Sequence, residues 1–264
     1  MIPFTKVNGN GNDFILFEAA KCPSTIRDAG FIQRLCDRHK GVGGDGMLVI
    51  SDSSDSEVAF HLDYHNSDGS WETFCANGTR CAVQYFGRMQ REPKAFCVTT
   101  GAGKHRAEIL DDGLVRLQIL APSHVTDMLE ISTVSGQHVD SGAPHFAAQV
   151  EDLTDALVAE VGPEIRYADI FQPRGVNVNL YQRVDQHTIK VITYEKGVEA
   201  VVLSCASGST AAAFQAAHTN KMLSPIRIIN PGGELVVAFD DDWQDVSVTG
   251  PAMLVYSSEL PDDF

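Results

Sequence analysis

Two short stretches of the sequence are nearly the same: Cys75-Ala76-Asn77-Gly78-Thr79 and Cys205-Ala206-Ser207-Gly208-Ser209. Each reads Cys-Ala, then Asn or Ser, then Gly, then a hydroxyl residue, and the second begins 130 residues after the first. The same offset aligns Gly103 with Gly233 and Asp111-Asp112 with Asp241-Asp242. Several matches in one register predict a duplicated domain, because the offset is far longer than the period of about 20–50 residues in solenoid repeats.

The boundary between the two halves is expected near Pro122, which interrupts the pattern between residues 121 and 126. A chain of 264 residues is long enough for one large domain or two smaller ones, so length alone does not decide. With the repeat, we expect an N-terminal half over residues 1–123 and a C-terminal half over residues 124–264. The last strand of the chain could pack back on the N-terminal half.

Alternation of apolar and polar residues predicts strands in both halves. Such segments are Gly46–Ile50, Ala59–Tyr64, Val115–Ile119 and Glu234–Phe239. Helical patterns follow the two repeated motifs, over Arg80–Gly87 and Thr210–Ala217. Gly87 is the expected end of the first helix. The second helix is apolar on nearly all sides, which predicts that it lies buried among strands.

Composition and charge exclude several classes of protein. The chain is 44% hydrophobic and 21% charged, as is typical of a globular protein. Its formal net charge of −15, with no basic cluster, argues against a nucleic-acid partner. No apolar run approaches the roughly 18 residues of a membrane span, and the N-terminus lacks the pattern of a secretory signal. We therefore expect a cytoplasmic enzyme that has no membrane partner and acts on a small substrate.

The six cysteines do not form the pattern of a disulfide scaffold or of a zinc site. They are few and irregularly spaced in a chain of this length, and no Cys-x-x-Cys pair occurs among them. Most such thiols are small buried hydrophobic residues. One interpretation of Cys75 and Cys205 is therefore that both are core residues, repeated only because the halves share an ancestor.

The position of the two repeated cysteines favours proton transfer instead. Each precedes a Gly-containing turn that opens into a helix, where unpaired N–H groups and the positive end of the helix dipole point outward. Such a place lowers the pKa of a thiol and binds a carboxylate. Inversion of a stereocentre needs proton removal on one face and delivery on the other. The pattern thus predicts a cofactor-independent amino-acid racemase or epimerase, with Cys75 and Cys205 as its acid–base pair.

Over nearly its full length the sequence resembles the diaminopimelate epimerase family. Ten motifs in order carry the resemblance, starting with Gly11-Asn12-Asp13-Phe14 and the segment 36–46 and ending with Pro231-Gly232-Gly233 and Thr249-Gly250-Pro251-Ala252. Between them lie Asn66–Ser70, Cys75–Cys81, Gly142–His145, Gly175–Val178, Tyr194–Gly197 and Cys205–Gly208. The glycine-rich stretch Gly41–Gly44 alone would be only a weak indication of phosphate binding, and a plain turn explains it as well.

The resemblance implies an α+β fold of two pseudo-symmetric domains. Each would be a mostly antiparallel, barrel-like sheet around a central helix, with the active site in the cleft between the domains. It also implies that neither pyridoxal phosphate nor a metal takes part. An exposed sheet face could support a homodimer.

Roles for individual residues follow from the same resemblance. It assigns Cys75 and Cys205 as the two catalytic bases and places His145 and Glu195 beside the thiols. Without it, His145 is as readily a hydrogen-bonded loop histidine, and the asparagines are turn residues. The residues that it implies for substrate binding are Asn12, Asn66, Ala76, Asn77, Gly78, Asn177, Lys196, Ala206, Ser207 and Gly208.

Several departures from the family pattern bear on the substrate. Ala143 replaces the asparagine of Gly-Asn-Pro-His, Lys196 replaces the arginine of Glu-Arg-Gly, and Glu199-Ala200-Val201 replaces Gly-Glu-Thr. In both cysteine motifs, alanine replaces the glycine that follows the cysteine. The family arginine and asparagine help to recognise the distal end of diaminopimelate, and lysine lacks arginine's planar, two-pronged grip on a carboxylate. We expect diaminopimelate as the substrate, with another amino acid, such as histidine, as the alternative.

Other classes of function remain open at this stage. An isomerase of the similarly folded phenazine-biosynthesis or proline racemase groups is one alternative. Both cysteines are present, which argues against the first of these. A non-catalytic protein that captures an amino acid is the alternative outside enzymes, and full function of a Cys75→Ala or Cys205→Ala variant would identify it.

Overall fold

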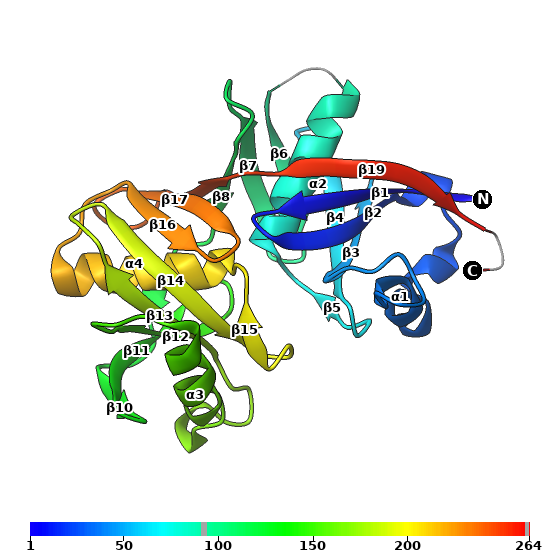
Figure 1. Ribbon diagram of the computed structural model, residues 1–264. Helices are drawn as coiled ribbons and strands as arrows, with labels where there is room; N and C mark the ends of the chain where they lie inside the picture. Colours follow the sequence, from blue (N-terminus) through cyan, green and yellow to red (C-terminus); the bar gives the residue numbers. More distant parts are fainter. Residues whose placement is uncertain (91–93, 262–263) are drawn as a thin grey trace. The chain divides into compact units, whose positions relative to one another are not determined.

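The computed structural model describes residues 1–90, 94–261 and 264 and divides into two compact units (Figure 1). The first unit holds residues 1–118 and 250–264, and the second holds residues 119–249. Strands dominate both units, and four α-helices accompany them in the described residues. The expected α+β class is confirmed.

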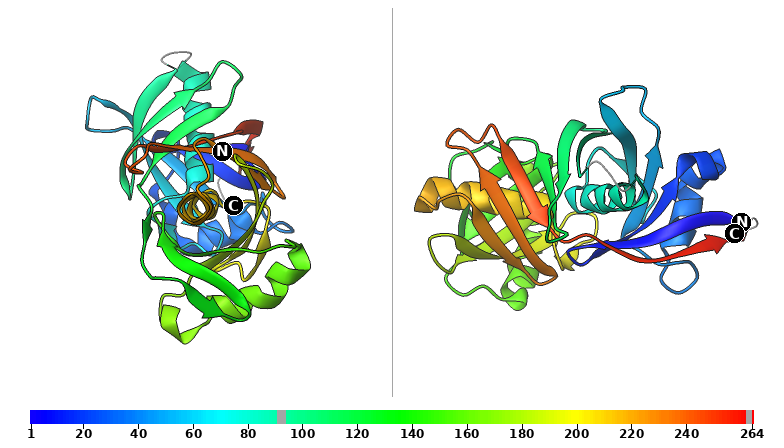
Figure 2. Two further views of the ribbon diagram at one scale, coloured as in Figure 1. Left: turned by 90° about the vertical axis from the view of Figure 1, so that its left-hand side faces the viewer. Right: turned by 90° about the horizontal axis from the view of Figure 1, so that it is seen from above.

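The first unit is built from strands β1 to β8 together with the last strand of the chain. Its strands are β1 (Ile2–Gly9), β2 (Asn12–Glu18), β3 (Gly46–Ser51), β4 (Val58–Asn66), β5 (Trp71–Glu72), β6 (Ala95–Thr100), β7 (Gly103–Ile109), β8 (Val115–Ile119) and β19 (Met253–Leu260). Its helices are α1 (Ala29–Cys36) and α2 (Ala76–Gln90), with short 3-10 turns η1 (Ala19–Lys21) and η2 (Ser24–Arg27). β19 pairs antiparallel with β1, so Ile2 lies beside Leu260 and the chain termini lie close together (Figure 2).

The second unit repeats this plan. Its strands are β9 (Ser123–His124), β10 (Leu129–Ile131), β11 (Val134–Asp140), β12 (Pro144–Gln149), β13 (Asn177–Arg183), β14 (Thr188–Glu195), β15 (Ala200–Val202), β16 (Ile226–Asn230), β17 (Gly233–Phe239) and β18 (Val246–Gly250). Its helices are α3 (Asp155–Arg166) and α4 (Ala206–Asn220), with the turn η3 (Asp169–Phe171). All four predicted strand segments are strands here: β3, β4, β8 and β17.

The offset of 130 residues is visible in the elements themselves. Shifting α2 by this number gives α4, and shifting β7 gives β17. Gly103 and Gly233 open the two equivalent strands, and both have positive φ (112° and 138°) that glycine adopts without strain. Parallel pairs also recur: β2–β3 and β4–β6 in the first unit correspond to β12–β13 and β14–β16 in the second. Antiparallel pairs connect the other neighbouring strands within each unit.

A helix lies inside the sheet of each unit. α2 packs against β1, β2, β3, β4, β7 and β19, and α4 packs against β11, β12, β13, β14, β16 and β17. The side chains of α4 are buried on nearly every side from Ala206 to Ala216, as its apolar sequence predicts. Both helices begin four residues earlier than expected, at Ala76 and Ala206.

The expected helix end at Gly87 is wrong, because α2 continues to Gln90. Gly87 has a packing role instead: a Cβ there would lie 2.2 Å from Ile109 Cδ1 of β7. The missing side chain therefore lets the helix approach the sheet closely.

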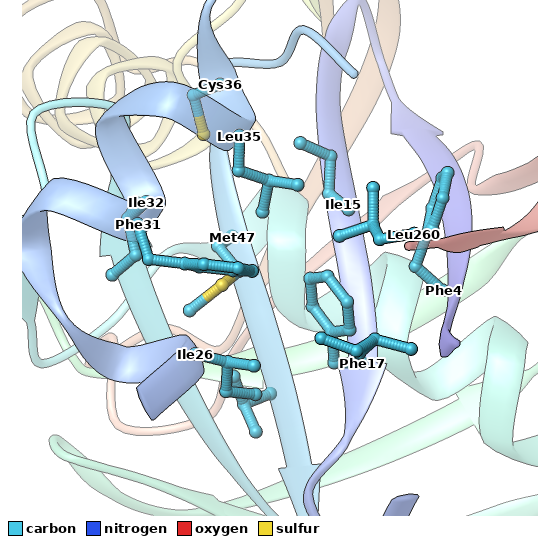
Figure 3. Close-up of a cluster of buried hydrophobic side chains, with 12 residues drawn as sticks. Phe4, Ile15, Phe17, Ile26, Phe31, Ile32, Leu35, Cys36, Met47 and Leu260 are labelled. Carbon is cyan, nitrogen blue, oxygen red and sulfur yellow. The ribbon is translucent and has the colours of Figure 1, made fainter. Parts of the chain in front are cut away.

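The outer helix of each unit covers the sheet with an apolar stripe. On α1 the buried residues Phe31, Ile32 and Leu35 recur at helical spacing and face β2 and β3 (Figure 3). On α3, Val158, Val161 and Ile165 do the same. Among the residues that the structure describes, none of the helices combines the length and the apolar character that a membrane span would need.

Candidate active site

Both repeated cysteines cap the helices that they precede. The backbone N–H of Gly78 donates to Cys75 Sγ at 3.4 Å, and the N–H of Gly208 donates to Cys205 Sγ at 3.4 Å. Cys205 is the N-cap residue of α4, with extended backbone angles. The N–H groups of a helix's first turn have no intrahelical acceptor, and the dipole is positive there. Each sulfur therefore lies where negative charge is stabilised.

In the first unit, a chain of amides leads away from the Cys75 motif. Asn77 Nδ2 donates to Asn12 Oδ1 at 2.5 Å, and Asn12 Nδ2 donates to Asp45 Oδ2 at 3.0 Å. Asn77 Oδ1 accepts from Arg80 at 2.7 Å. The structure thus brings together the predicted residues Cys75, Asn77, Gly78 and Asn12.

A group of charged residues holds Asn12 in place. Asp13 accepts from Arg38 at 2.9 and 2.6 Å and pairs with Lys6 at 2.7 Å. Burial raises the pKa of Asp13, but the hydrogen bonds and charges of Arg38 and Lys6 outweigh it and hold this pKa at about 2. Arg38 also pairs with Asp45 at 2.8 Å. The start of β2 is therefore held by two sets of contacts: the ion pairs of Asp13 with Arg38 and Lys6, and the hydrogen bond from Asn12 to Asp45.

The remaining polar residues predicted for the site gather at one edge of each sheet. Phe14 of β2 pairs with Gly46 of β3, which pairs with Asn66 of β4, so Asn12 and Asn66 lie at the same edge. In the second unit, His145 pairs with Asn177, and Val178 pairs with Tyr194, which places Glu195 at that edge too. The printed hydrogen bonds of Asn66 join it to Tyr64 and Ser70 rather than to the Cys75 motif.

Asn177 connects the turn after β14 to β12. Its Oδ1 accepts from the backbone N–H of Lys196 at 2.9 Å, and its Nδ2 donates to the carbonyl of Pro144 at 3.2 Å. The half-buried Lys196 is therefore positioned through its backbone. No cluster of three or more histidine, cysteine or acidic side chains that could hold a metal occurs within residues 1–90, 94–261 and 264.

Beside Cys205, three polar side chains form a continuous relay. Cys205 Sγ lies 3.5 Å from Ser207 Oγ, and Ser207 Oγ lies 3.0 Å from His145 Nε2. The other ring nitrogen, His145 Nδ1, lies 3.0 Å from Asn179 Nδ2. The relay joins the predicted residues Cys205, Ser207 and His145 to Asn179, which the sequence analysis does not single out.

The hydrogen bonds around Asn179 determine which nitrogen of His145 carries the proton. Asn179 Nδ2 faces the carbonyl oxygens of Phe146 and Asn177 at 3.4 and 3.5 Å, which can only accept, and Thr193 donates to Asn179 Oδ1 at 2.9 Å. His145 Nδ1 therefore accepts, and the proton of the neutral ring lies on Nε2. Nε2–H donates to Ser207 Oγ, and the hydroxyl of Ser207 is in turn within hydrogen-bond distance of Cys205 Sγ.

Burial of His145 makes the stability of the fold depend on pH. The ring is fully buried, and desolvation, with a smaller effect of the charges of His138 and Lys196, lowers the pKa of His145 to about 3. In the unfolded chain its pKa is about 6.5. Between these values the unfolded state binds more protons, so the free energy of unfolding falls as the pH falls. From about pH 7 to about pH 5 we expect His145 alone to remove about 2 kcal/mol.

Urea unfolding of the wild type and of His145→Gln at both pH values measures this contribution. The variant is expected to lose about 2 kcal/mol less than the wild type over the interval. The exposed His39→Gln serves as the matched control. Equal losses in the wild type and His145→Gln would contradict the prediction.

Comparison with known proteins identifies the family of the chain. The family model described as diaminopimelate epimerase matches residues 4–125 and 137–255. The chain belongs to the diaminopimelate epimerase family. The diaminopimelate epimerase of Aquifex aeolicus is 34% identical over 273 residues, which cover 98% of this chain and 98% of that protein. The enzyme of the same name from Methanocella arvoryzae is 33% identical over 281 residues, covering 100% of this chain and 98% of that protein.

Solved structures share the two-domain fold. A probable proline racemase from Agrobacterium radiobacter K84 superimposes with a TM-score of 0.74 and 14% identity, covering 100% of this chain and 94% of that chain. A PhzF-family phenazine biosynthesis protein from Bacillus anthracis gives a TM-score of 0.71 with 12% identity, covering 98% and 99%. At such identities the likeness concerns the fold alone. Membership of the epimerase family rests on the family model and the curated relatives.

Two buried residues beside the cysteine motifs have no predicted role. Asn179 occupies an inward position of β13, where the alternation of the strand predicts only a core side chain. Arg80 belongs to the first cysteine motif of the family, and its charge on a helix inside a sheet is the signal that could have drawn attention to it.

Proposed function

We propose that this protein is a diaminopimelate epimerase that inverts one α-carbon of its substrate, with Cys75 and Cys205 as the acid–base pair. The observation that carries the proposal is the pair of equivalent sulfurs, each 3.4 Å from a first-turn helix amide, in a chain of this family. A cysteine that only fills the core does not need a hydrogen bond from a helix amide to its sulfur. Two thiols supply both proton transfers, so the proposed reaction needs no cofactor.

The proposed substrate carboxylate binds the amides at the start of each helix. The N–H groups of Gly78 and Gly208 bind the sulfurs. Residues 76, 77, 206 and 207 also lie in the first turns, where N–H groups lack intrahelical acceptors. Hydrogen bonds from such groups strengthen as enolate charge builds on the carboxylate, which makes the α-proton more acidic.

The two thiols act in the proposal on opposite faces of one stereocentre. One is a thiolate and removes the α-proton, while the other is a thiol and delivers a proton on the far side. Exchange of these roles allows reaction in either direction. His145 supports Cys205 through Ser207, and Glu195 is the carboxylate proposed to assist at the same sheet edge. Asn12, Asn66 and Asn177 are proposed to bind the rest of the substrate.

The experiment that tests the substrate is inversion in deuterium oxide. Purified protein is offered LL-diaminopimelate and, separately, a panel of L-amino acids that includes histidine and proline. We expect formation of the meso isomer with deuterium at the inverted α-carbon, and neither inversion nor exchange in the panel. Inversion of another amino acid alone would replace the proposed substrate and keep the proposed chemistry. Binding without exchange of any compound would favour an amino-acid-binding protein.

A second substrate is favoured by one specific observation. Lys196 and Ala143 stand where the family has arginine and asparagine for the distal end of diaminopimelate. A single ammonium group cannot clamp a carboxylate in the two-pronged manner of a guanidinium. A racemase for an amino acid without a distal carboxylate, such as histidine, is therefore the second candidate. A Lys196→Arg variant that gains activity toward diaminopimelate and loses it toward the other amino acid would support it.

A further inference from the structure

Arg80 is the largest fully buried side chain in the described part of the chain, with an exposed fraction of 0%. It lies in the second turn of α2, five residues after Cys75. Its guanidinium donates to Asn77 Oδ1 at 2.7 Å and to the carbonyl of Ala76 at 3.3 Å. Its Nε has no hydrogen-bond partner among the residues that the structure describes. The group is therefore surrounded by neutral acceptors of its own helix.

Within residues 1–90, 94–261 and 264, no carboxylate pairs with Arg80. Charged residues on three strands that pack against α2 pair elsewhere: Lys6 of β1 with Asp13, Asp63 of β4 with Arg27, and Glu108 of β7 with Arg116. Burying an uncompensated charge is costly, so a buried guanidinium normally faces an anion. Among the described residues, the positive charge of Arg80 is thus not balanced by a carboxylate.

Two thiols are the titratable groups whose charge acts on Arg80. Burial lowers the pKa of Arg80 to about 10, and Cys81 and Cys75 act in the opposite direction, so the group is a cation at neutral pH. Cys81 is fully buried, and this burial raises its pKa to about 12. Cys81 therefore stays a thiol. Cys75, half-buried and bonded to the Gly78 amide, is the group that can become the anion.

The equivalent helix position of the second unit carries no charge. The residue equivalent to Arg80 is Thr210, whose hydroxyl donates to the carbonyl of Ala206 at 2.9 Å. Cys205 meets the relay of Ser207 and His145. The two thiols thus have equivalent helix positions, but a buried guanidinium follows Cys75 in its helix where a threonine follows Cys205.

We infer that Arg80 is a positioning residue whose buried charge selects Cys75, rather than Cys205, as the thiolate of the resting protein. The inference deepens the proposed function and rests on it, because an acid–base pair needs one thiolate and one thiol at the same time. In this inference Arg80 acts through Cys75 and does not contact the substrate. The asymmetry between the halves would then fix the protonation state from which each catalytic cycle starts.

The pH dependence of thiol alkylation tests this inference without any substrate. Folded protein is treated with iodoacetamide over a range of pH, and the modified Cys75 and Cys205 peptides are quantified separately by mass spectrometry. In the wild type, Cys75 is expected to react faster than Cys205 at about pH 7. Faster reaction of Cys205 would overturn the inference even if the protein proves to be an active epimerase.

Substitution of Arg80 separates its charge from its packing. Arg80→Met keeps the length and removes the charge, and we expect Cys75 to react about tenfold or more slowly at about pH 7, with its alkylation profile moved up by about one pH unit. Arg80→Lys keeps the charge and should retain most of the wild-type rate. Cys205 in the same molecule is the internal control and is expected to keep its profile.

A purely structural role of Arg80 predicts other outcomes. Loss of its bond to Asn77 alone would slow Cys75 as much in Arg80→Lys as in Arg80→Met, and general loosening would move both cysteines together. Either result, or an unchanged Cys75 profile in Arg80→Met, overturns the inference. Arg80→Gln, neutral but able to donate to Asn77, repeats the test if the methionine variant does not fold. Inactivity toward every amino acid, with the expected alkylation pattern intact, would refute the proposed function and leave the charge effect standing.

Discussion

Alanine at either Cys75 or Cys205 is expected to lower the rate of inversion at least about 100-fold, the usual loss when one proton-transfer group is removed. In the proposed mechanism each thiol is indispensable, because one removes the α-proton and the other supplies its replacement. Neither Gly78 nor Gly208, which bond the two sulfurs at 3.4 Å, offers a group that could take over. The loss should appear in both directions of the reaction.

The two single variants should differ in the exchange that survives. With Cys75 replaced, Cys205 can still take up and return a proton on its own face, so one configuration of the substrate should exchange its α-proton with deuterium oxide and retain its configuration. With Cys205 replaced, the opposite configuration should do so. The measurement is α-deuterium incorporation by nuclear magnetic resonance, starting from each stereoisomer in turn.

Matched cysteine variants control for general damage. Cys97 lies half-buried on β6 and takes no part in the proposed site, so Cys97→Ala should invert substrate at the wild-type rate. Full inversion activity of Cys75→Ala or Cys205→Ala would remove the two-thiol mechanism. Loss of exchange with both configurations in both variants would indicate that the thiols act only as a coupled pair.

The repeat is the part of the fold that the sequence determines most directly. Cys75 and Cys205 lie in register with Gly103 and Gly233, and the elements of the two units follow the same offset. Strands such as β3 and β17 could be predicted because turn residues bound each segment, and its residues either alternate between apolar and polar or are continuously apolar. Gly103 and Gly233 both have positive φ, which glycine adopts without strain. This requirement of the backbone is visible in the sequence as two glycines at equivalent positions.

The helix starts were not predictable from local preference. Asn77-Gly78 and Ser207-Gly208 have the composition of turns, and glycine disfavours a helix by about 1 kcal/mol. Yet both pairs belong to the first turns of α2 and α4. Hydrogen bonds from the glycine amides to the cysteine sulfurs, together with the burial of each helix, outweigh the local cost. Tertiary packing of this kind leaves no mark in a window of a few residues.

For the candidate site, family motifs predicted the residues at the two sheet edges but not the residues behind them. Asn179 depends on partners that strand pairing brings near, which local sequence does not indicate. Arg80 contacts Asn77 and Ala76 at helical spacing, but only because α2 begins at Ala76, earlier than its local sequence predicts. A buried asparagine in β13 and a buried arginine in α2 also run against the usual distribution of polar residues. Their hydrogen-bond partners, on which the proposed roles rest, are visible only in the structure.

The equivalent glycines of the two motifs are expected to tolerate alanine very differently. At Gly208 a Cβ would lie 2.0 Å from Asn179 Oδ1, and Asn179 cannot move away without losing its bonds to Thr193 and His145. At Gly78 the nearest atom is Leu48 Cδ2 at 2.8 Å, the tip of a flexible side chain. We expect Gly208→Ala to lower the free energy of unfolding by about 2–3 kcal/mol, as overpacking does, and Gly78→Ala to change it by less than about 1 kcal/mol.

Urea unfolding of Gly208→Ala, Gly78→Ala and Asn179→Ala, and of Gly208→Ala combined with Asn179→Ala, measures this difference and its cause. If the clash with Asn179 is responsible, the double variant should lose less free energy of unfolding than Gly208→Ala and Asn179→Ala lose together, by about 1 kcal/mol or more. Additive losses would place the strain elsewhere in α4. Equal losses at the two glycines would show that the backbone of the first turn, rather than the histidine relay behind it, requires a residue without a side chain.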